Sequence, residues 1–290
     1  MSQDILHRFI FENIAARGMI VQLDKSWQRL QEQKDYPEVI RNLLGEFIAA
    51  NALLAATLKF EGALTMQIRG NGPVSLMLME CTSEQHLRGL AKYDDTIQAG
   101  SLKQMFGDGQ LALTIDNDKT GERYQGIVEL SGDKISHALE NYLMQSEQLD
   151  TRLFLATNNN KACGILIQKL PGQTDDNPDD WHRIIQLAET IKDQELFNLE
   201  AAEIIHRLFN EDDVRLLDSE HYLFRCTCTR ERVANMLISL GHQEIKDILE
   251  EMGKIEIDCE FCNQHYDFDA VDAEELFATD IHHSAPKTKQ

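Results

Sequence analysis

The chain has 290 residues, 42% of them hydrophobic, and a formal net charge of −21. This length suits about two domains, and the hydrophobic fraction is sufficient for packed cores. The acidity argues against nucleic-acid binding, which needs clustered lysine and arginine. The charge is also uneven. Residues 176–290 contain 27 acidic and 11 basic residues (net −16), whereas residues 1–175 contain 22 and 17 (net −5). We therefore expect a different organisation after residue 175.

The N-terminal residues Met1–Arg8 lack the basic region and the uninterrupted apolar stretch of a secretory signal. The longest nearly apolar stretch, Phe47–Leu58, is too short to span a bilayer. Six cysteines without an export signal indicate reduced thiols. We therefore expect a soluble, cytoplasmic protein.

Residues 1–175 show strand and helix patterns in turn. A strand at Gly18–Leu23 precedes a long helix from Pro37 to Lys59, whose apolar residues have helical spacing. A helix capped by Ser131 is expected after two hairpins. The further expected strands are Leu64–Ile68, Val74–Met79, Leu111–Ile115, Tyr124–Leu130, Arg152–Ala156 and Cys163–Leu170. This order predicts an α+β domain with a mostly antiparallel sheet and packed helices.

The same region has no motif typical of an enzyme. It contains no dinucleotide or phosphate loop, no zinc-protease helix and no nucleophile elbow. Cys81 and Cys163 stand alone beside predicted strands, where a buried structural thiol is the ordinary expectation. We therefore expect no catalytic residues.

A boundary loop is predicted at 171–180, and two or three amphipathic helices follow it up to residue 224. Their apolar positions include Ile184 and Ile204, and their other faces are acidic. An ordinary helical connector would fit this pattern. The alternative is a metastable linker docked on the first domain, because short acidic helices gain most of their helicity from docking.

Two close cysteine pairs mark residues 225–290, which we expect to form a small C-terminal domain. They are Cys226 with Cys228 and Cys259 with Cys262, and thirty residues separate Cys228 from Cys259. Zn²⁺ prefers soft thiolates and binds four of them tetrahedrally in structural sites. The spacing therefore predicts one zinc ion bound by these four cysteines. Four independent buried thiols are the alternative, which the clustering disfavours.

The elements around these cysteines can also be predicted. Thr229 should cap a helix that Gly241 ends, and a second helix is expected from Gln243 to Glu251. Strands are expected at Lys254–Ile257 and His265–Phe268, and a disordered tail around His282 and His283. His242 and His265 lie near the cysteines, but four thiolates already complete the coordination shell.

Three other zinc or thiol functions fit the sequence less well. A zinc-ribbon nucleic-acid module needs a basic face, and this region is acidic. A zinc hydrolase needs an open coordination position, which a four-thiolate site lacks. A thiol–disulfide oxidoreductase is compatible with Cys-x-x-Cys alone, although that motif normally begins a helix and here precedes a strand. Reduction of insulin by dithiothreitol distinguishes an oxidoreductase from a chaperone.

The segments Phe224–Val233 and Asp258–Cys262 resemble the heat shock protein 33 family, and the likeness extends over the whole chain. The resemblance implies an ATP-independent holdase, not an enzyme, which is inactive while reduced and zinc-bound. Oxidation would then form two disulfides, release zinc, unfold the linker 176–224 and the domain 225–290, and produce a homodimer that binds unfolding proteins. The expected disulfides are Cys226–Cys228 and Cys259–Cys262, whose sulfurs stay neighbours after unfolding.

Overall fold

The computed structural model describes residues 4–170 and 179–283. It forms two compact units, Met1–Arg225 and Cys226–Gln290, which are described separately. Both units combine helices with sheets, so the predicted α+β class is confirmed. Among the described strands, all pairs are antiparallel except the pair of β11 with β5.

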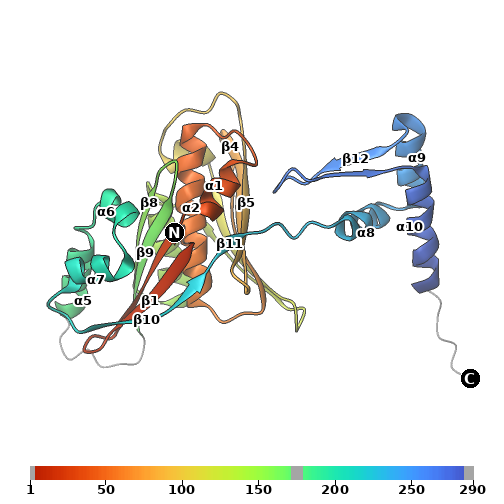
Figure 1. Cartoon of the computed structure of the whole chain (residues 1–290). Coiled ribbons are helices and arrows are strands. Elements are labelled where there is room, and N and C mark those ends of the chain that lie inside the picture. The colour runs from red at the N-terminus through yellow and green to blue at the C-terminus, as the bar shows by residue number, and fades with distance from the viewer. Residues whose placement is uncertain (1–3, 171–178, 284–290) are drawn as a thin grey trace, which may run out of the picture. The chain divides into compact units, whose positions relative to one another are not determined.

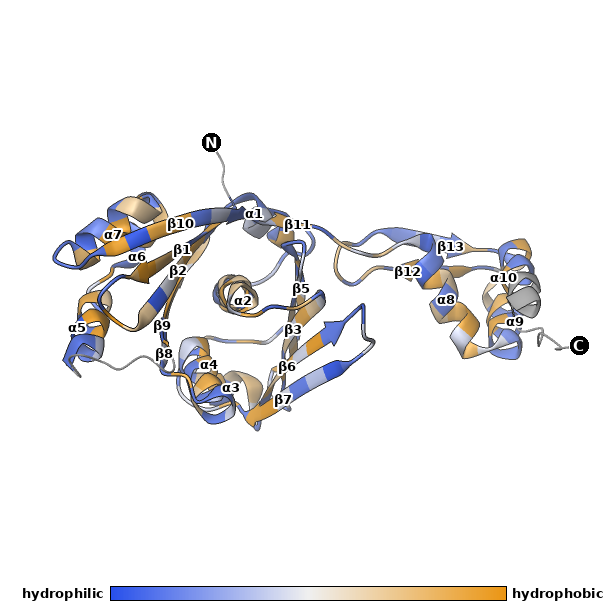
Figure 2. Ribbon diagram, turned by 90° about the horizontal axis from the view of Figure 1, so that it is seen from below, coloured by the Kyte–Doolittle hydropathy of each residue, from blue (hydrophilic) through white to orange (hydrophobic). Residues whose placement is uncertain are grey.

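The first unit has two sheets on either side of one helix. In spatial order, the five-stranded sheet contains β10 (Val214–His221), β1 (Ile5–Phe11), β2 (Ala16–Leu23), β9 (Ala162–Lys169) and β8 (Thr151–Thr157). The six-stranded sheet contains β11 (Leu223–Phe224), β5 (His86–Tyr93), β4 (Val74–Thr82), β3 (Gly62–Arg69), β6 (Gln110–Asn117) and β7 (Arg123–Glu129). Figure 2 shows α2 (Glu38–Thr57) between these sheets, and α2 contacts strands of both.

The central helix α2 is buried because a sheet lies on each side of it. Its alanine- and leucine-rich sequence favours helix, and Gly45 permits a close approach. A Cβ atom at Gly45 would lie 2.0 Å from Thr157 Oγ1. By length and composition α2 could cross a membrane, so the expectation that no apolar stretch is long enough was wrong. However, 78% of the most apolar 18-residue stretch of α2 is buried inside the protein, as expected for the core helix of a globular unit.

Three helices cover the outer face of the five-stranded sheet, as Figure 1 shows: α5 (Asp179–Ala188), α6 (Asp193–Asn198) and α7 (Ala201–Phe209). Side chains of these helices and of the sheet form a buried apolar group that we call the outer cluster. Its members are Phe9, Phe11, Ala16, Ile20, Ala156, Cys163, Ile165, Ile167, Ile184, Ile185, Ala188, Leu196, Phe197, Ala201, Ile204, Ile205, Leu208 and Phe209. The sheet is thus covered on both faces, which explains why β9 is an almost continuous apolar run.

Three shorter helices complete the first unit: α1 (Lys25–Gln31), α3 (Leu102–Phe106) and α4 (Ile135–Tyr142), with a π-helical turn at Leu143–Glu147. The predicted cap of α4 by Ser131 was wrong. The helix starts at Ile135, and Lys134 occupies the N-cap position without a side-chain bond. The Ser131 hydroxyl instead accepts a hydrogen bond from Asn141 Nδ2 at 3.1 Å.

The second unit joins a hairpin to three helices. The hairpin consists of β12 (Ile255–Asp258) and β13 (His265–Phe268); the helices are α8 (Arg230–Leu240), α9 (His242–Met252) and α10 (Ala270–His283). The residues His282 and His283, for which a disordered tail was expected, stand at the end of α10. The fully buried apolar group of this unit is small: Ala234, Leu237, Ile245, Ile255, Phe268 and Ala273.

Most predicted elements are confirmed, with shifted ends, and others were not foreseen. The predicted loop at 171–180 falls mostly outside the described residues, and α5 already begins at Asp179. The sequence did not reveal β1, β5, α1, α3 or β10. The strand β10 is important because it lies in the segment expected to be helical, and it pairs with β1 from Ile5 to Phe11.

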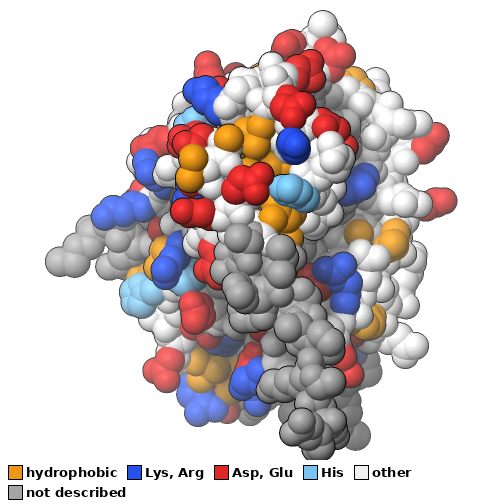
Figure 3. All heavy atoms as spheres, turned by 90° about the vertical axis from the view of Figure 1, so that its right-hand side faces the viewer, with side chains coloured by type: hydrophobic (Ala, Val, Ile, Leu, Met, Phe, Trp, Pro, Cys, Tyr) orange, Lys and Arg blue, Asp and Glu red, His pale blue; other side chains and the backbone are white. Residues whose placement is uncertain are grey.

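Acidic side chains are numerous on the face of the molecule shown in Figure 3. On the described part of the face in Figure 3, red carboxylates surround small orange apolar areas, and basic side chains lie scattered among them. This distribution agrees with the formal net charge of −21.

Candidate metal centre

The four predicted ligand residues lie in two loops of the second unit. Cys226 and Cys228 lie in extended chain between β11 and α8. Cys259 and Cys262 lie in the turn that joins β12 to β13. The Cys262 and Asn263 amides both donate to the Cys259 carbonyl, at 3.3 and 2.8 Å. This tight turn aims both of its thiols in one direction.

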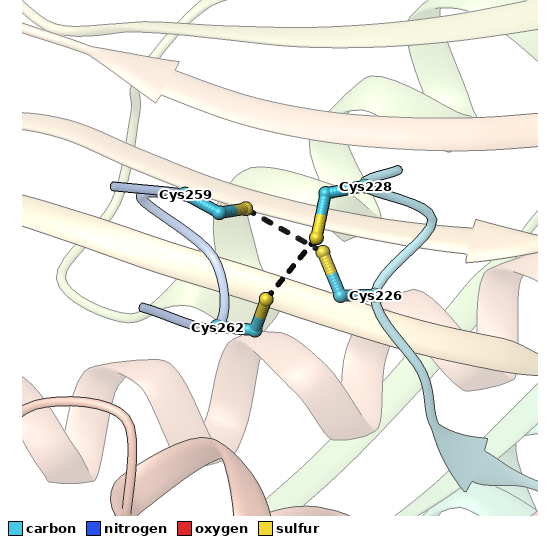
Figure 4. Close-up of side chains that lie close together, drawn as sticks. All are labelled: Cys226, Cys228, Cys259 and Cys262. Atoms are coloured by element: carbon cyan, nitrogen blue, oxygen red, sulfur yellow. Dashed lines mark hydrogen bonds between the residues drawn. The ribbon is translucent and has the colours of Figure 1, made fainter. Parts of the chain in front are cut away.

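The structure brings the four sulfurs together, as Figure 4 shows. All four Sγ atoms lie within 4.8 Å of one another. Across the two loops, Cys226 is 3.6 Å from Cys259, and Cys228 is 3.3 Å from Cys262. A tetrahedral site with zinc–sulfur bonds of about 2.3 Å has sulfur–sulfur edges of about 3.8 Å. The cluster therefore has the size and the donor set of a closed tetrahedral thiolate site.

The close approach of four cysteine thiols favours binding of a cation between them. Burial raises the pKa of the Cys262 thiol, and hydrogen bonds with the other three cysteines raise it further, against a backbone hydrogen bond from Gln264. Four thiols at this separation cannot all ionise without a positive charge between them. A bound divalent ion would supply that charge and hold the ligands as thiolates.

Two arginines at the start of α8 contact the chain around the site, one on the first cysteine loop and one on β13. Arg232 donates to the Thr227 carbonyl at 3.1 Å and to its hydroxyl at 2.6 Å. Arg230 stacks 4.2 Å from the centre of the Phe268 ring and donates to the Asp267 carbonyl at 2.6 Å. These contacts join the start of α8 to β13, the strand that follows the second cysteine pair.

The start and end of α8 follow the predicted signals. Thr229 accepts from the Arg232 amide at 3.1 Å, and Gly241 ends the helix with a φ of 95°. The positive φ at Gly241 is one that glycine adopts without strain. Both predictions are confirmed.

His242, His265, Cys81 and Cys163 lie outside the cluster. The Nδ1 atom of His265 is 2.8 Å from Asp258, and the ring of His242 packs 4.8 Å from that of Phe277. Cys81 and Cys163 are buried on β4 and β9. Burial raises the pKa of both thiols, that of Cys163 to about 12, so neither is poised to react.

Sequence reasoning missed Tyr266 at this site. A hydrogen bond with Cys228 raises the pKa of Tyr266 to about 12. Tyr266 lies on β13 opposite Ile257 of β12. A signal was present, because the tyrosine follows the second cysteine pair closely, on a strand that must run beside the metal loops.

Comparison with known proteins gives consistent results. A family model described as "Hsp33 protein" matches residues 4–269. The 33 kDa chaperonin of Methylobacillus flagellatus is 48% identical over 280 residues, which cover 96% of each chain. That of Nitrosococcus oceani is 45% identical over 287 residues, covering 99% of this chain and 98% of the relative. The crystal structure of the 33 kDa chaperonin (heat shock protein 33 homolog) from Thermotoga maritima is similar in fold. It has a TM-score of 0.83 at 22% identity, covering 97% of this chain and 100% of that one.

Proposed function

Because the chain belongs to the Hsp33 family, whose members are chaperones rather than enzymes, we propose that it is a redox-regulated, ATP-independent holdase. In this proposal it binds unfolding proteins during oxidative stress and is inactive while reduced. The three functional parts are a core of residues 1–175, a metastable linker of 176–224 and a switch domain of 225–290.

The resident metal in this proposal is one Zn²⁺ ion per chain, bound by Cys226, Cys228, Cys259 and Cys262. The all-sulfur donor set and the sulfur separations support zinc over a hard cation. When bound, zinc would fold the site and keep its ligands in the reactive thiolate form.

The switch domain depends on this site because its own core is small. Structural zinc contributes apparent binding free energies of about 10–16 kcal/mol in small domains. Whole domains are stable by only about 5–15 kcal/mol, so loss of the ion should unfold this unit.

Oxidation removes the ligands in pairs. Closing one disulfide takes two electrons from two thiolates, and an oxidant of the peroxide class accepts them. We expect Cys226–Cys228 and Cys259–Cys262, because each pair is close in the chain and remains so after unfolding. Two such steps leave no thiolate ligand for the ion.

The outer cluster is the observation that carries the holdase proposal. Three helices of the linker cover an apolar sheet face that includes Phe9, Ile20 and Ile165, each no more than 1% exposed. Release of α5–α7 would expose this face together with the apolar stripe of the helices. Contiguous exposed apolar surface of this kind binds other apolar chains. We therefore propose that this covered apolar face is the client-binding surface.

The proposed partners are unfolded polypeptides and, in the active state, a second copy of the chain. Nucleic acid and membrane are not among them, in keeping with the acidic surface and the buried position of α2. We place the protein in the cytoplasm, where its six free thiols would stay reduced.

Light scattering tests the proposal directly. A chemically unfolded test protein is diluted into buffer with the reduced, zinc-loaded protein or with the peroxide-treated one. Suppression of aggregation only by the oxidised sample is expected, without added ATP. Equal suppression by both samples would contradict the proposed redox regulation. Suppression by neither sample would contradict the proposed holdase activity.

A thiol–disulfide oxidoreductase is less consistent with this geometry. The Cys259–Cys262 motif lies on a turn between two strands, whereas a catalytic pair of that class begins a helix. Turnover in insulin reduction would favour the oxidoreductase.

A further inference from the structure

A cavity of about 370 Å³ lies where the linker docks on residues 1–175. Helices α2 and α4 and strand β8 line one side of it, and the chain from Glu189 to Leu196 lines the other. Charged and titratable side chains come from both sides: Glu46 on α2, Lys134, His137 and Glu140 at α4, Arg152 on β8, and Glu189 and Asp193 of the linker. Four carboxyl groups therefore meet in one cavity at the docking interface.

Glu46 is the carboxyl group of this cavity that is buried without a hydrogen-bond donor. Burial raises the pKa of Glu46 to about 7, with Asp193 adding to the shift and Lys134 opposing it. No hydrogen bond from the described residues stabilises its carboxylate form. Burial of this kind favours the neutral form of a carboxyl group. Glu46 is therefore largely protonated just below neutral pH.

The other three carboxyl groups have more support for their charge. Burial raises the pKa of Glu140 as well, but the Leu153 amide donates to its Oε1 atom at 2.8 Å, and this bond favours the carboxylate. Glu189 and Asp193 are exposed at the rim of the cavity, where water solvates a carboxylate. Glu46 is thus the member whose ionisation costs most while the linker is docked.

The helix α6 is anchored on residues 1–175 at its C-terminal end. The side-chain amide of Gln22 donates to the Leu196 carbonyl at 2.7 Å and to the Leu199 carbonyl at 3.0 Å. Lys161 Nζ donates to the Phe197 carbonyl at 2.6 Å. The helix begins at Asp193, which lines the cavity. A charge in the cavity therefore acts on the end of α6 that these bonds do not hold.

We propose that Glu46 makes linker docking pH-dependent: its protonated form permits α6 to dock, and its ionised form favours release. An ionised Glu46 would repel Asp193 and Glu189 across the cavity, and it would be deprived of water while the linker is docked. Release returns Glu46 to water and removes both costs. Because its pKa is higher in the docked state, docking weakens as pH rises from about 4.5 to about 7.

The size of the effect follows from the difference in proton affinity between the docked and the released state. With a pKa of about 7 when docked and about 4.5 after release, the equilibrium constant for release rises about twentyfold between pH 5.5 and 7.5. The inference deepens the proposed function, and it rests on that function only for the step from linker release to client binding.

Hydrogen exchange of the reduced, zinc-loaded protein measures docking directly. Protection factors, which are corrected for the intrinsic effect of pH on exchange, are compared at pH 5.5 and 7.5 for peptides from residues 179–209. We expect them to fall about twentyfold. Faster exchange in these peptides than in β3 and β4 shows that the linker opens locally, without unfolding of the whole unit. Metal analysis checks the zinc content at both pH values.

Four variants link this change to the cavity. Glu46→Gln is neutral at every pH, so its protection factors should change less than about twofold. Glu38→Gln makes the same exchange at an exposed position of α2 and should keep the wild-type change. Asp193→Asn removes a charge that raises the pKa of Glu46, so the midpoint of the pH profile should move to lower pH. Lys134→Gln removes the opposing charge and should move the midpoint to higher pH, and a purely structural role would not produce such opposite shifts.

Protection of residues 179–209 that is the same at pH 5.5 and 7.5 would overturn the inference, as would a Glu46→Gln protein that keeps the wild-type change. Midpoints that Asp193→Asn and Lys134→Gln leave unmoved would also overturn it. Light scattering of the peroxide-treated protein separates this result from the proposed function. Absence of holdase activity in that sample, together with pH-dependent opening of the reduced protein, would count against the proposed function alone.

Discussion

Replacing Ile204 by aspartate should release the linker while the metal centre stays reduced and loaded. Ile204 lies on α7, is fully buried and belongs to the outer cluster. Losing its burial costs about 1.5–3 kcal/mol, and a carboxylate at the same position adds a further penalty. A total of about 3 kcal/mol raises the released population about a hundredfold.

Ala202→Asp is the matched control. It introduces the same side chain on the same helix at an exposed position, where an acid near the helix start is tolerated. We therefore expect normal docking in this variant. Aggregation suppression, zinc content and protease sensitivity of residues 179–221 are measured on the same reduced samples.

The expected result for Ile204→Asp is a protease-sensitive linker, one zinc per chain and partial holdase activity. A protease-sensitive linker without activity would show that uncovering the sheet face is not sufficient. A protease-resistant linker would show that docking is much stronger than this reasoning assumes.

Three further outcomes are expected. Cys226→Ser should lower the zinc content of the reduced protein and destabilise only the second unit; full zinc retention, measured by metal analysis, would contradict the ligand assignment. Peptide mapping after peroxide treatment should find Cys226–Cys228 and Cys259–Cys262, whereas a dominant bridge between the pairs would show that oxidation occurs in the folded site. Burial raises the pKa of Glu46 to about 7, with Asp193 adding to the shift and Lys134 opposing it. The folded state therefore binds the extra proton, and stability falls by up to about 3 kcal/mol as pH rises from about 4.5 to 7. Glu46→Gln should flatten this slope in denaturant titrations between about pH 4.5 and 7, and an unchanged slope would exclude Glu46 as its source.

Local patterns were enough to predict much of the fold. The hairpin of β3 and β4 follows from two alternating runs around Gly70–Gly72, and α2 from long helical spacing. The cysteine cluster was also predictable, because metal chemistry restricts the residue types and their spacing.

Long-range pairing was not predictable in the same way. Every residue of β10 is exposed or half-buried, so its sequence lacks the alternation of a half-buried strand. Its identity as a strand comes from β1, at the opposite end of the first unit's sequence. Tyr266 was missed although it follows the second cysteine pair closely in the sequence, because its hydrogen bond with Cys228 forms only in the tertiary fold.

In the proposed switch, the short strand β11 is the first part of the core that would detach when the second unit unfolds. Between β10 and the first cysteine, the Leu223 amide donates to the Gln85 carbonyl at 3.1 Å, and the Arg225 amide to the Leu87 carbonyl at 3.0 Å. Further back, the Tyr222 amide donates to the Asp4 carbonyl at 2.8 Å.

In the proposed switch, unfolding that starts at the cysteines would have to break these bonds before it reaches β10. It then separates β10 from β1 one rung at a time, starting at His221 opposite Ile5. Withdrawal of Tyr222 also belongs to this path, because its side chain is buried in the core of the first unit and its hydroxyl donates to the Ala52 carbonyl at 3.3 Å. In the proposed switch, the segment from the metal loops back to α7 would therefore detach in sequence order, beginning at its cysteine end.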